Sequence, residues 1–330
     1  MKRTRKRFFL QWHITHKCNL RCIHCYQEEY NGHMEREDLF ECLDKFCSFI
    51  KKTGYEPRIN LTGGEPLSHP DFFDLCSEIR KRKINFSVLT NGTLIDEETA
   101  KRLKKLGPVF VQVSLDGIKK SHDLVRGEGN FDKALAGIDN LKKQGIKVLV
   151  SFTAQKNNIA DFSGLARVCK EHKVDKLWWD RVVTSTKEEH EKLALTTKQF
   201  RSFVKKTARL KKIYDFLGHR FISNGRGLQF LGSKNDCYVC NAGKGLAVIL
   251  ADGSVMPCRR LPFVIGNIKN AQLYDIMSKS TVVKQLRSTS VPDGCIGCED
   301  YHRCGGGSKC VTFAQTGKLD VRDVNCFKKR

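Results

Sequence analysis

Short apolar runs rich in β-branched and aromatic residues alternate with amphipathic stretches through the first half of the chain. The apolar runs predict strands over residues 9–15, 58–62, 85–90, 109–115, 147–153 and 176–183. Apolar positions at helical spacing predict helices over residues 34–51, 70–82, 96–106, 131–144 and 159–172. Strands and helices that alternate in this order predict an α/β fold, with a parallel sheet and helices outside it.

Residues with binding chemistry follow several of the predicted strands directly. In barrels built from such units, ligands bind at the C-terminal ends of the strands. A cysteine triplet follows the first strand, a Thr-Gly-Gly-Glu-Pro run (62–66) the second and an Asn-Gly pair (91–92) the third, while Ser114 and Asp116 end the fourth. We therefore expect these strand ends to converge on one mouth.

The character of the chain changes after the sixth strand. Residues 188–218 are polar with a helical pattern, and from about residue 235 Gly, Cys and short apolar runs replace the long helices. Two of these runs, 246–250 and 254–257, flank an Asp-Gly pair and predict a β-hairpin. We expect three parts, namely a barrel over residues 1–190, a helical bridge over 191–234 and a small Cys-rich domain over 235–330.

The composition indicates in which compartment the protein is found and what its cysteines do. The chain has 330 residues, and none of its apolar runs approaches the ~20 residues that span a bilayer. Its basic start is followed only by Phe8, Phe9 and Leu10, too short an apolar segment for a signal peptide. We expect a cytoplasmic protein without membrane contact, in which fifteen cysteines favour metal binding or catalysis over disulfides.

The formal net charge of +23 bears on possible partners. Thiolate ligands of metal clusters would offset part of this charge. The remainder favours an acidic partner, which is an acidic peptide, a nucleic acid or an anionic electron donor. A solvated basic surface explains the charge equally well, because many Lys and Arg fall on predicted helices, as in residues 101–105 and 201–212.

The cysteine triplet is the most informative motif. Cys18, Cys22 and Cys25 have C-x3-C-x2-C spacing, and three thiolates this close together suit an iron–sulfur cluster. A cubane has four irons, so three cysteines leave one iron open to a small molecule. The alternative is a zinc knuckle, but zinc ligands usually come as C-x2-C pairs with a second pair or histidines elsewhere.

The triplet with His24 inside it, the Gly-Gly-Glu-Pro run and the Ser114-Leu115-Asp116 segment together resemble the radical S-adenosylmethionine (radical SAM) enzymes. The resemblance implies a partial (β/α)6 TIM-like barrel with a catalytic 4Fe-4S cluster on Cys18, Cys22 and Cys25. It also implies that S-adenosylmethionine (SAM) binds the open iron and is reductively cleaved to methionine and a 5′-deoxyadenosyl radical, which abstracts hydrogen from a substrate.

The resemblance also implies which residues contact SAM near the triplet. Gly63 and Gly64 would let the backbone approach the ligand without a Cβ clash. Glu65 would accept a hydrogen bond from the methionine ammonium group. His24 would lie near the adenine.

Further contacts are expected at the ends of the later strands. By the same resemblance, Ser114 and Asp116 would bond the ribose hydroxyls. Ser151 on strand five is a further candidate for the SAM site. Arg181 on strand six would bind the carboxylate of the ligand, or it forms a structural ion pair with Asp180 or another neighbour.

A second set of cysteines lies in the last third of the chain, where Gly253 and Cys258 form a G-x4-C element and C-x2-C-x5-C follows from Cys295. The pattern resembles the SPASM extension of radical SAM proteins. By that resemblance two auxiliary 4Fe-4S clusters, making three in all, would be held by Cys237, Cys240, Cys258 and Cys310 and by Cys295, Cys298, Cys304 and Cys326. Five residues separate Cys304 from Cys310, where the family usually has three. Two zinc sites are the alternative.

Some other residues that could carry chemistry are expected to be structural. Cys42, Cys47, Cys76 and Cys169 fall on predicted helices without cluster spacing, and buried free cysteines are common in cores. The pair 178–179 consists of two tryptophans on one strand, so one of them is expected to face the mouth.

The resemblance to SPASM-type members implies a ribosomally made peptide as substrate, modified by a thioether or carbon–carbon crosslink or by epimerisation. The first strand begins near Met1, so we expect a precursor peptide to need a separate leader-recognition protein or the basic surface. A flavodoxin- or ferredoxin-type protein would donate electrons. Arg259 stands where sulfatase-maturing relatives carry an Asp base, which disfavours formylglycine formation.

Two other classes of function remain open. One is a radical SAM enzyme that acts on a small molecule in cofactor or haem-type biosynthesis. The other is a non-enzymatic iron–sulfur or RNA-binding protein that uses the positive charge, and nucleic acid is the partner that the motifs favour least.

Overall fold

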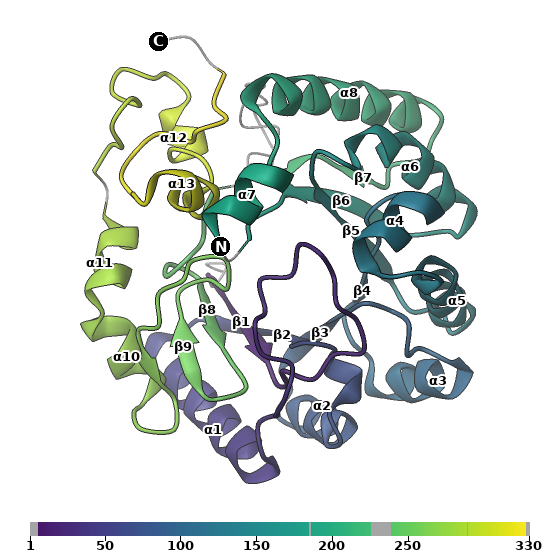
Figure 1. Ribbon diagram of the computed structural model, residues 1–330. Coiled ribbons are helices and arrows are strands. Elements are labelled where there is room, and N and C mark those ends of the chain that lie inside the picture. The colour runs from purple at the N-terminus through teal and green to yellow at the C-terminus, as the bar shows by residue number, and fades with distance from the viewer. Residues whose placement is uncertain (1–5, 185, 226–238, 289, 328–330) are drawn as a thin grey trace, which may run out of the picture.

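The computed structural model describes residues 6–184, 186–225, 239–288 and 290–327. The strands form a curved sheet, and the helices of the first two thirds of the chain lie outside it (Figure 1). The C-terminal segments continue beside β8 and β9 (Figure 1). This arrangement is an open, TIM-like partial barrel, as the sequence predicts.

Six parallel strands make the central part of the sheet. They are β1 (Arg7–His13), β2 (Glu56–Thr62), β3 (Asn85–Thr90), β4 (Val111–Ser114), β5 (Val148–Ala154) and β6 (Lys176–Arg181). Each strand pairs in parallel with the next, so that Gln11 on β1 lies opposite Asn60 on β2, and Ser114 on β4 opposite Ser151 on β5. The predicted strand order is therefore confirmed, with the first strand ending at His13 rather than at residue 15.

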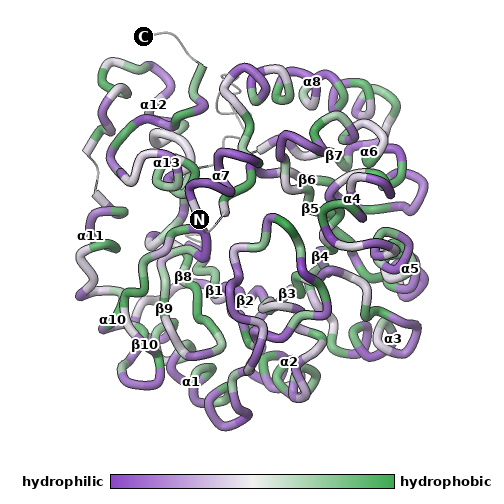
Figure 2. The backbone as a smooth tube through the Cα atoms, in the orientation of Figure 1, coloured by the Kyte–Doolittle hydropathy of each residue, from purple (hydrophilic) through white to green (hydrophobic). Residues whose placement is uncertain are grey.

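The helices that follow these strands cover the outer face of the sheet. They are α1 (Arg36–Thr53), α2 (Phe72–Lys81), α3 (Glu97–Leu106), α4 (Lys119–Arg126), α5 (Asn130–Lys143) and α6 (Phe162–Glu171), with short 3-10 turns at Pro66–Ser68 and Ile159–Asp161. Hydrophilic and hydrophobic residues alternate along α5 (Figure 2), as expected for a helix with one buried face. The sequence did not predict α4, which has only eight residues.

Helix α1 illustrates how the pattern produces the packing. Its buried residues include Leu39, Leu43 and Phe46, spaced three or four apart, and Phe46 meets Phe8 of β1 with ring centroids 6.5 Å apart. The helix ends at Gly54, whose positive φ of 70° lets its N–H bond back to the helix. One face of the helix is thereby fixed against the sheet.

The sheet continues beyond the six strands at both edges. On one edge β7 (Ile222–Ser223) pairs with β6, after α7 (Lys187–Leu193) and α8 (Thr197–Phe216). On the other edge β8 (Leu246–Ile249) lies parallel to β1 and forms the predicted hairpin with β9 (Ser254–Met256), which pairs with β10 (Gly266–Asn267). The hairpin thus joins the barrel sheet itself, which has ten strands in the described parts of the chain.

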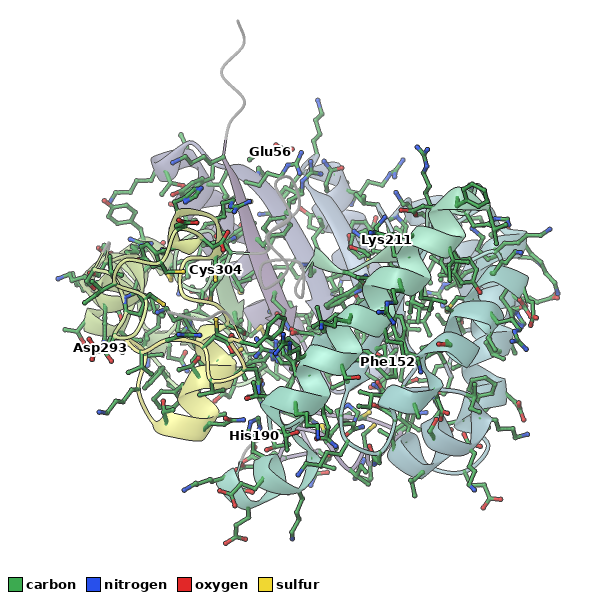
Figure 3. All side chains as sticks on the ribbon, turned by 90° about the horizontal axis from the view of Figure 1, so that it is seen from above. Glu56, Phe152, His190, Lys211, Asp293 and Cys304 are labelled. Atoms are coloured by element: carbon green, nitrogen blue, oxygen red, sulfur yellow. The ribbon has the colours of Figure 1, made fainter. Side chains whose placement is uncertain are left out.

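Helix α8, predicted as part of a bridge, packs directly on the outer face of the sheet. Phe203 on this helix contacts Phe152 of β5 and Trp179 of β6, with centroid distances of 6.2 and 4.8 Å. Seen from above, Phe152 lies at this helix (Figure 3). The domain boundaries at residues 190 and 234 stay a prediction.

A second, smaller core lies in the C-terminal part. It contains Leu261, Val311 and the Phe263–Phe313 pair, whose rings are 4.8 Å apart. The helices here are α10 (Leu273–Lys279), α11 (Thr281–Arg287), α12 (Tyr301–Cys304) and α13 (Lys309–Thr316). None of the helices in the described parts of the chain is long and apolar enough to cross a membrane.

Candidate active site and cysteine clusters

The cysteine triplet lies on an irregular loop after β1, where its three thiols are partly exposed. Burial raises the pKa of Cys18 to about 11, and Cys22 and Cys25 add to the rise. The sulfurs of Cys22 and Cys25 are therefore close enough to Cys18 to act on its charge. The structure brings together the triplet that the sequence singled out.

Hydrogen-bond donors surround the three sulfurs. The backbone N–H groups of Leu20 and Gln27 donate to Cys18 Sγ and Cys25 Sγ at 3.4 Å each. The Arg126 guanidinium donates through Nη1 to Cys22 Sγ at 3.7 Å. Such donors typically surround the thiolate ligands of iron–sulfur clusters, so the residues present fit that group.

Among the described residues, no three His, Cys, Asp or Glu side chains are grouped as ligands of one metal ion.

The two glycines after β2 touch the cysteine loop. A Cβ on Gly64 would overlap the backbone oxygen of Lys17, and one on Gly63 would meet that of Thr15. The same backbones are hydrogen-bonded, because Gly64 N–H donates to Thr15 O at 2.7 Å and Glu65 N–H to Lys17 O at 2.8 Å. Because these two residues lack side chains, the cysteine loop packs directly on their backbone. The approach of this backbone to a ligand stays a prediction.

Glu65 lies fully buried beneath this contact. Its carboxylate accepts hydrogen bonds from Thr90 Oγ1 and the Asn91 N–H, both at 2.8 Å, and from the Leu67 N–H at 3.2 Å. Burial raises the pKa of Glu65 to about 7 despite these donors. In the structure the side chain braces the ends of β2 and β3, and its contact with the SAM ammonium group stays a prediction.

Ser114 and Ser151 lie side by side on neighbouring strands. Their hydroxyl oxygens are 3.5 Å apart, because the two residues are opposite each other in the β4–β5 register. Both side chains are partly exposed. The predicted ribose contact of Ser114 and the SAM contact of Ser151 would thus involve adjacent groups.

Asp116 is fully buried and already bonded within the protein. Its carboxylate accepts from Arg126 Nε and from the Thr153 N–H, each at 2.7 Å. His24 Nε2 is 3.7 Å from the same carboxylate, and burial lowers the pKa of His24 to about 4, so its imidazole is neutral at neutral pH. The predicted contacts of His24 with adenine and of Asp116 with ribose stay predictions.

Sequence reasoning missed Arg126, which joins Asp116 to the cysteine loop. It lies at the C-terminal end of α4, one helical turn after His122, which in turn accepts a hydrogen bond from the Asp116 N–H at 3.2 Å. The signal that could have found it is the spacing of an Asp, a His and an Arg over residues 116–126.

Arg181 corrects one expectation. Its two terminal nitrogens donate to the two carboxylate oxygens of Asp323, each at 2.8 Å, and Nη1 also donates to Asn325 Oδ1 at 2.8 Å. The side chain is 5% exposed. The structure therefore shows the alternative, a structural ion pair, which ties β6 to the C-terminal segment, rather than a carboxylate-binding arginine at the mouth.

Three of the auxiliary cysteines, Cys240, Cys258 and Cys310, lie near one another. Burial raises the pKa of Cys258 to about 12, and Cys310 and Cys240 add to the rise. These three line a cavity of about 100 Å³ together with Gln11 and Arg259. Cys237, predicted as the fourth member, lies outside the described residues.

The second set is grouped in the same way. Burial raises the pKa of Cys304 to about 11, with Cys326 and Cys295 adding to the rise. Burial also raises the pKa of Cys295, with contributions from Cys298 and Cys326. Sulfurs gathered in this way suit iron–sulfur clusters, although the assignment of each ligand stays a prediction.

Tyr26 and Arg259 connect the triplet with the first auxiliary set. Arg259 Nη2 donates to the Tyr26 backbone oxygen at 3.0 Å, and its guanidinium carbon lies 4.6 Å from the centre of the Tyr26 ring. Tyr26 follows Cys25 in the chain, and Arg259 follows Cys258. The loops that carry the two sets of cysteines are therefore in direct contact.

The remaining expectations concern the core. Cys42, Cys76 and Cys169 are buried on the helices of the barrel core, with Cys47 packed against it, as expected. No disulfide is formed between two cysteines of the described residues. Trp179 packs on α8, so Trp178 points to the inside of the barrel, where its Nε1 donates to Gln112 Oε1 at 3.1 Å.

A curved, mostly parallel sheet with a cysteine loop after its first strand is the arrangement of an enzyme of the barrel class. The family model of the radical SAM superfamily matches residues 12–168, and that of the SPASM iron–sulfur cluster-binding domain matches residues 240–299. The chain belongs to the radical SAM superfamily and carries a SPASM domain. As such it is an oxidoreductase-type enzyme that uses SAM and 4Fe-4S clusters.

Curated relatives have several activities. Fe-coproporphyrin III synthase of Methanosarcina barkeri is 37% identical over 177 residues, which are 52% of this chain and 43% of that protein, so the alignment spans less than half of the relative. AdoMet-dependent heme synthase of Nitratidesulfovibrio vulgaris is 26% identical over 97% of this chain and 92% of its own length. Mycofactocin maturase MftC of Mycolicibacterium smegmatis is 27% identical over 97% and 82%.

Among solved structures, anSMEcpe with bound AdoMet matches with a TM-score of 0.82 and 25% identity, covering 97% of this chain and 90% of that one. The likeness extends over the barrel and the C-terminal part together.

Proposed function

We propose that this radical SAM/SPASM enzyme acts on a ribosomally made peptide, in which it forms a thioether or carbon–carbon crosslink or epimerises a residue. The proposal is supported above all by the position of the first auxiliary cysteines, which touch the catalytic loop through Tyr26 and Arg259. A centre so close to the triplet is placed to take up the electron that a crosslinked substrate radical must lose.

Residues of the chain would prepare the reaction in distinct ways. Cys18, Cys22 and Cys25 would hold the cluster that supplies the electron for splitting SAM into methionine and the 5′-deoxyadenosyl radical. Ser114 and Ser151 offer adjacent hydroxyls to the ligand. The neutral ring of His24 lies above Asp116, where it can meet an adenine without adding a charge.

The inside of the barrel offers hydrogen-bonding groups that suit a peptide. Gln11, Gln112 and Trp178 bring neutral hydrogen-bonding groups to this space, and such groups match backbone amides. Arg181 and Arg260 are each paired with an aspartate of the protein. Arg259, which lines the cavity at the first auxiliary cysteines, has the backbone oxygen and the ring of Tyr26 as partners.

The proposal includes three 4Fe-4S clusters and three parts of the chain. The triplet would hold the SAM-binding cluster. The two auxiliary clusters would be ligated by Cys237, Cys240, Cys258 and Cys310 and by Cys295, Cys298, Cys304 and Cys326. The barrel would comprise residues 1–190, the bridge 191–234 and the SPASM domain 235–330.

The enzyme would need two protein partners. A flavodoxin- or ferredoxin-type protein of the cytoplasm would supply the electron, and a separate leader-recognition protein would present the precursor peptide. Excess positive charge on α8, as at Lys205, Lys206 and Arg209, is consistent with acidic partners.

A second candidate is a small-molecule reaction in haem-type biosynthesis. It is supported by the heme synthase that aligns with 97% of this chain and by the more similar Fe-coproporphyrin III synthase.

One experiment separates these functions. Anaerobically reconstituted protein is mixed with SAM, dithionite and a synthetic deuterated candidate peptide. We expect deuterium in the 5′-deoxyadenosine and a change in the peptide mass, and neither with the C22A variant. Label that arrives only from a deuterated coproporphyrin would refute the peptide substrate. Absence of 5′-deoxyadenosine under all conditions would refute radical chemistry.

A further inference from the structure

Arg126 makes the only side-chain hydrogen bond from a cation to a sulfur of the triplet among the described residues, from Nη1 to Cys22 Sγ at 3.7 Å. We propose that Arg126 is a positioning residue that raises the reduction potential of the N-terminal cluster, by holding a fixed positive charge and an N–H donor against Cys22. The inference rests on the proposed role of Cys22 as a cluster ligand.

The guanidinium is held in place from its other side. Its Nε donates to Asp116, which is itself fixed by the Thr153 N–H and, through its backbone oxygen, by Asn158 Nδ2 at 3.1 Å. The Arg126 side chain is 10% exposed and the Asp116 side chain 0%. An anchored and desolvated cation acts more strongly on a neighbouring charge than one in water.

The backbone keeps α4 and the cysteine loop in register beside this contact. The Ile23 N–H donates to the Val125 oxygen at 3.0 Å, and these residues directly follow Cys22 and precede Arg126. Asn130 Nδ2 donates to the Arg126 oxygen at 3.0 Å, which fixes the end of the helix. The position of the charge relative to Cys22 is therefore set by several bonds.

The direction of the effect follows from charge. A reduced cluster with thiolate ligands carries one more negative charge than the oxidised cluster. Hydrogen bonds to the sulfurs and nearby positive charge favour the more negative state, which raises the potential. Removal of the Arg126 charge should make the cluster harder to reduce, even when no SAM or substrate is present.

The chain offers a matched control. Arg21 lies on the cysteine loop, but its Nη1 donates to the backbone oxygens of Cys18 and Leu20 at 2.8 and 2.9 Å instead of to a sulfur. These bonds are exposed or only partly buried, and the guanidinium stacks on Tyr30 at 3.8 Å. R21Q therefore removes an arginine charge from the cysteine loop itself without removing a bond to sulfur.

The test is an anaerobic redox titration of the reconstituted full chain, followed by electron paramagnetic resonance. The signal that changes when SAM is added identifies the N-terminal cluster. At a fixed potential we expect R126Q to lower the ratio of reduced to oxidised cluster at least tenfold, which equals 59 mV for a one-electron couple. R126K should cause a smaller fall in the same direction, and R21Q less than a twofold change.

Two results would overturn the inference. One is an unchanged ratio of reduced to oxidised cluster in R126Q at full iron content, with SAM binding also unchanged. The other is the same unchanged ratio together with weaker SAM binding, which would make Arg126 a carboxylate ligand of SAM instead. If R126Q does not load iron, R126K decides, since an unchanged ratio there refutes the proposal. The titration needs no turnover, so its outcome is independent of the peptide assay.

Discussion

The Arg181–Asp323 pair gives a sharp test of how the C-terminal part is held to the barrel. The two side chains are 5% and 1% exposed. The Asp323 carboxylate accepts four hydrogen bonds, from Nη1 and Nη2 of Arg181, from the Ser308 N–H and from the Asn325 N–H. D323A leaves a buried guanidinium without its counter-charge and should lower the free energy of unfolding by about 4 kcal/mol.

The loss should reach the auxiliary site as well. Asp323 is three residues before Cys326, and the Cys326 N–H donates to its backbone oxygen at 2.9 Å. We therefore expect D323A to bind less iron than the native chain, with the deficit in the second auxiliary set. Anaerobic urea unfolding measures the free energy, and iron and sulfide analysis measures the occupancy.

Two controls make the test specific. D132A removes an exposed partner of Lys119, whose pair is 61% and 59% exposed, and should lower the free energy of unfolding far less than D323A does. The double variant R181M/D323L replaces the pair with apolar groups and should recover most of the stability lost in D323A. The reasoning is refuted if D323A costs no more than D132A, or if the double variant is less stable than D323A.

Two further predictions concern the barrel mouth. G64A should drive the cysteine loop away, with a loss of about 2 kcal/mol in stability and of iron at the triplet, because a Cβ there meets the Lys17 oxygen. G164A, on helix α6 and facing only the side chain of Ile118, should keep its iron, and equal iron in both variants would contradict the argument. Burial raises the pKa of Glu65 from 4.5 to about 7, so its contribution to stability is present below pH 4.5 and is lost as the pH rises through 7. In the native chain the free energy of unfolding should fall by about 3 kcal/mol over this range, and in E65Q this fall should be absent. A pH profile of E65Q that equals the native one would show that Glu65 does not titrate there.

The sequence predicted what depends on local periodicity. All six parallel strands and the five longer helices of the first part follow from apolar runs and helical spacing, and the strand ends carry the expected residues. Helix α4 was missed because eight residues contain too few turns to show a period. Arg126 was missed together with this helix, because its contact with Cys22 joins residues 104 positions apart in the chain.

The partner of Arg181 was also beyond local reasoning. Asp323 lies 142 positions away in sequence, whereas the expected alternatives were a ligand or the adjacent Asp180. Spacing alone can indicate that an arginine is buried and needs a partner, but it does not rank distant carboxylates. The Glu65 side chain shows the same limit, because its motif predicts a ligand contact while its observed partners lie on β3.

These long-range contacts have a common consequence for the metal sites. The Cys-rich part is joined to the barrel by β8 beside β1, by Arg260 with Asp180, by Arg259 on Tyr26 and by the Arg181–Asp323 pair. Each connection ends within a few residues of a predicted cluster ligand or on a strand that leads to one. Binding of a cluster that fixes these loops must therefore also stabilise the adjoining sheet edge, because ligand binding to the folded state alone adds to its stability. Conversely, a change that loosens β1 or β6 should alter the spacing between the triplet and the auxiliary cysteines. The distance between the redox centres is thus a property of the barrel sheet as much as of the loops that hold the sulfurs.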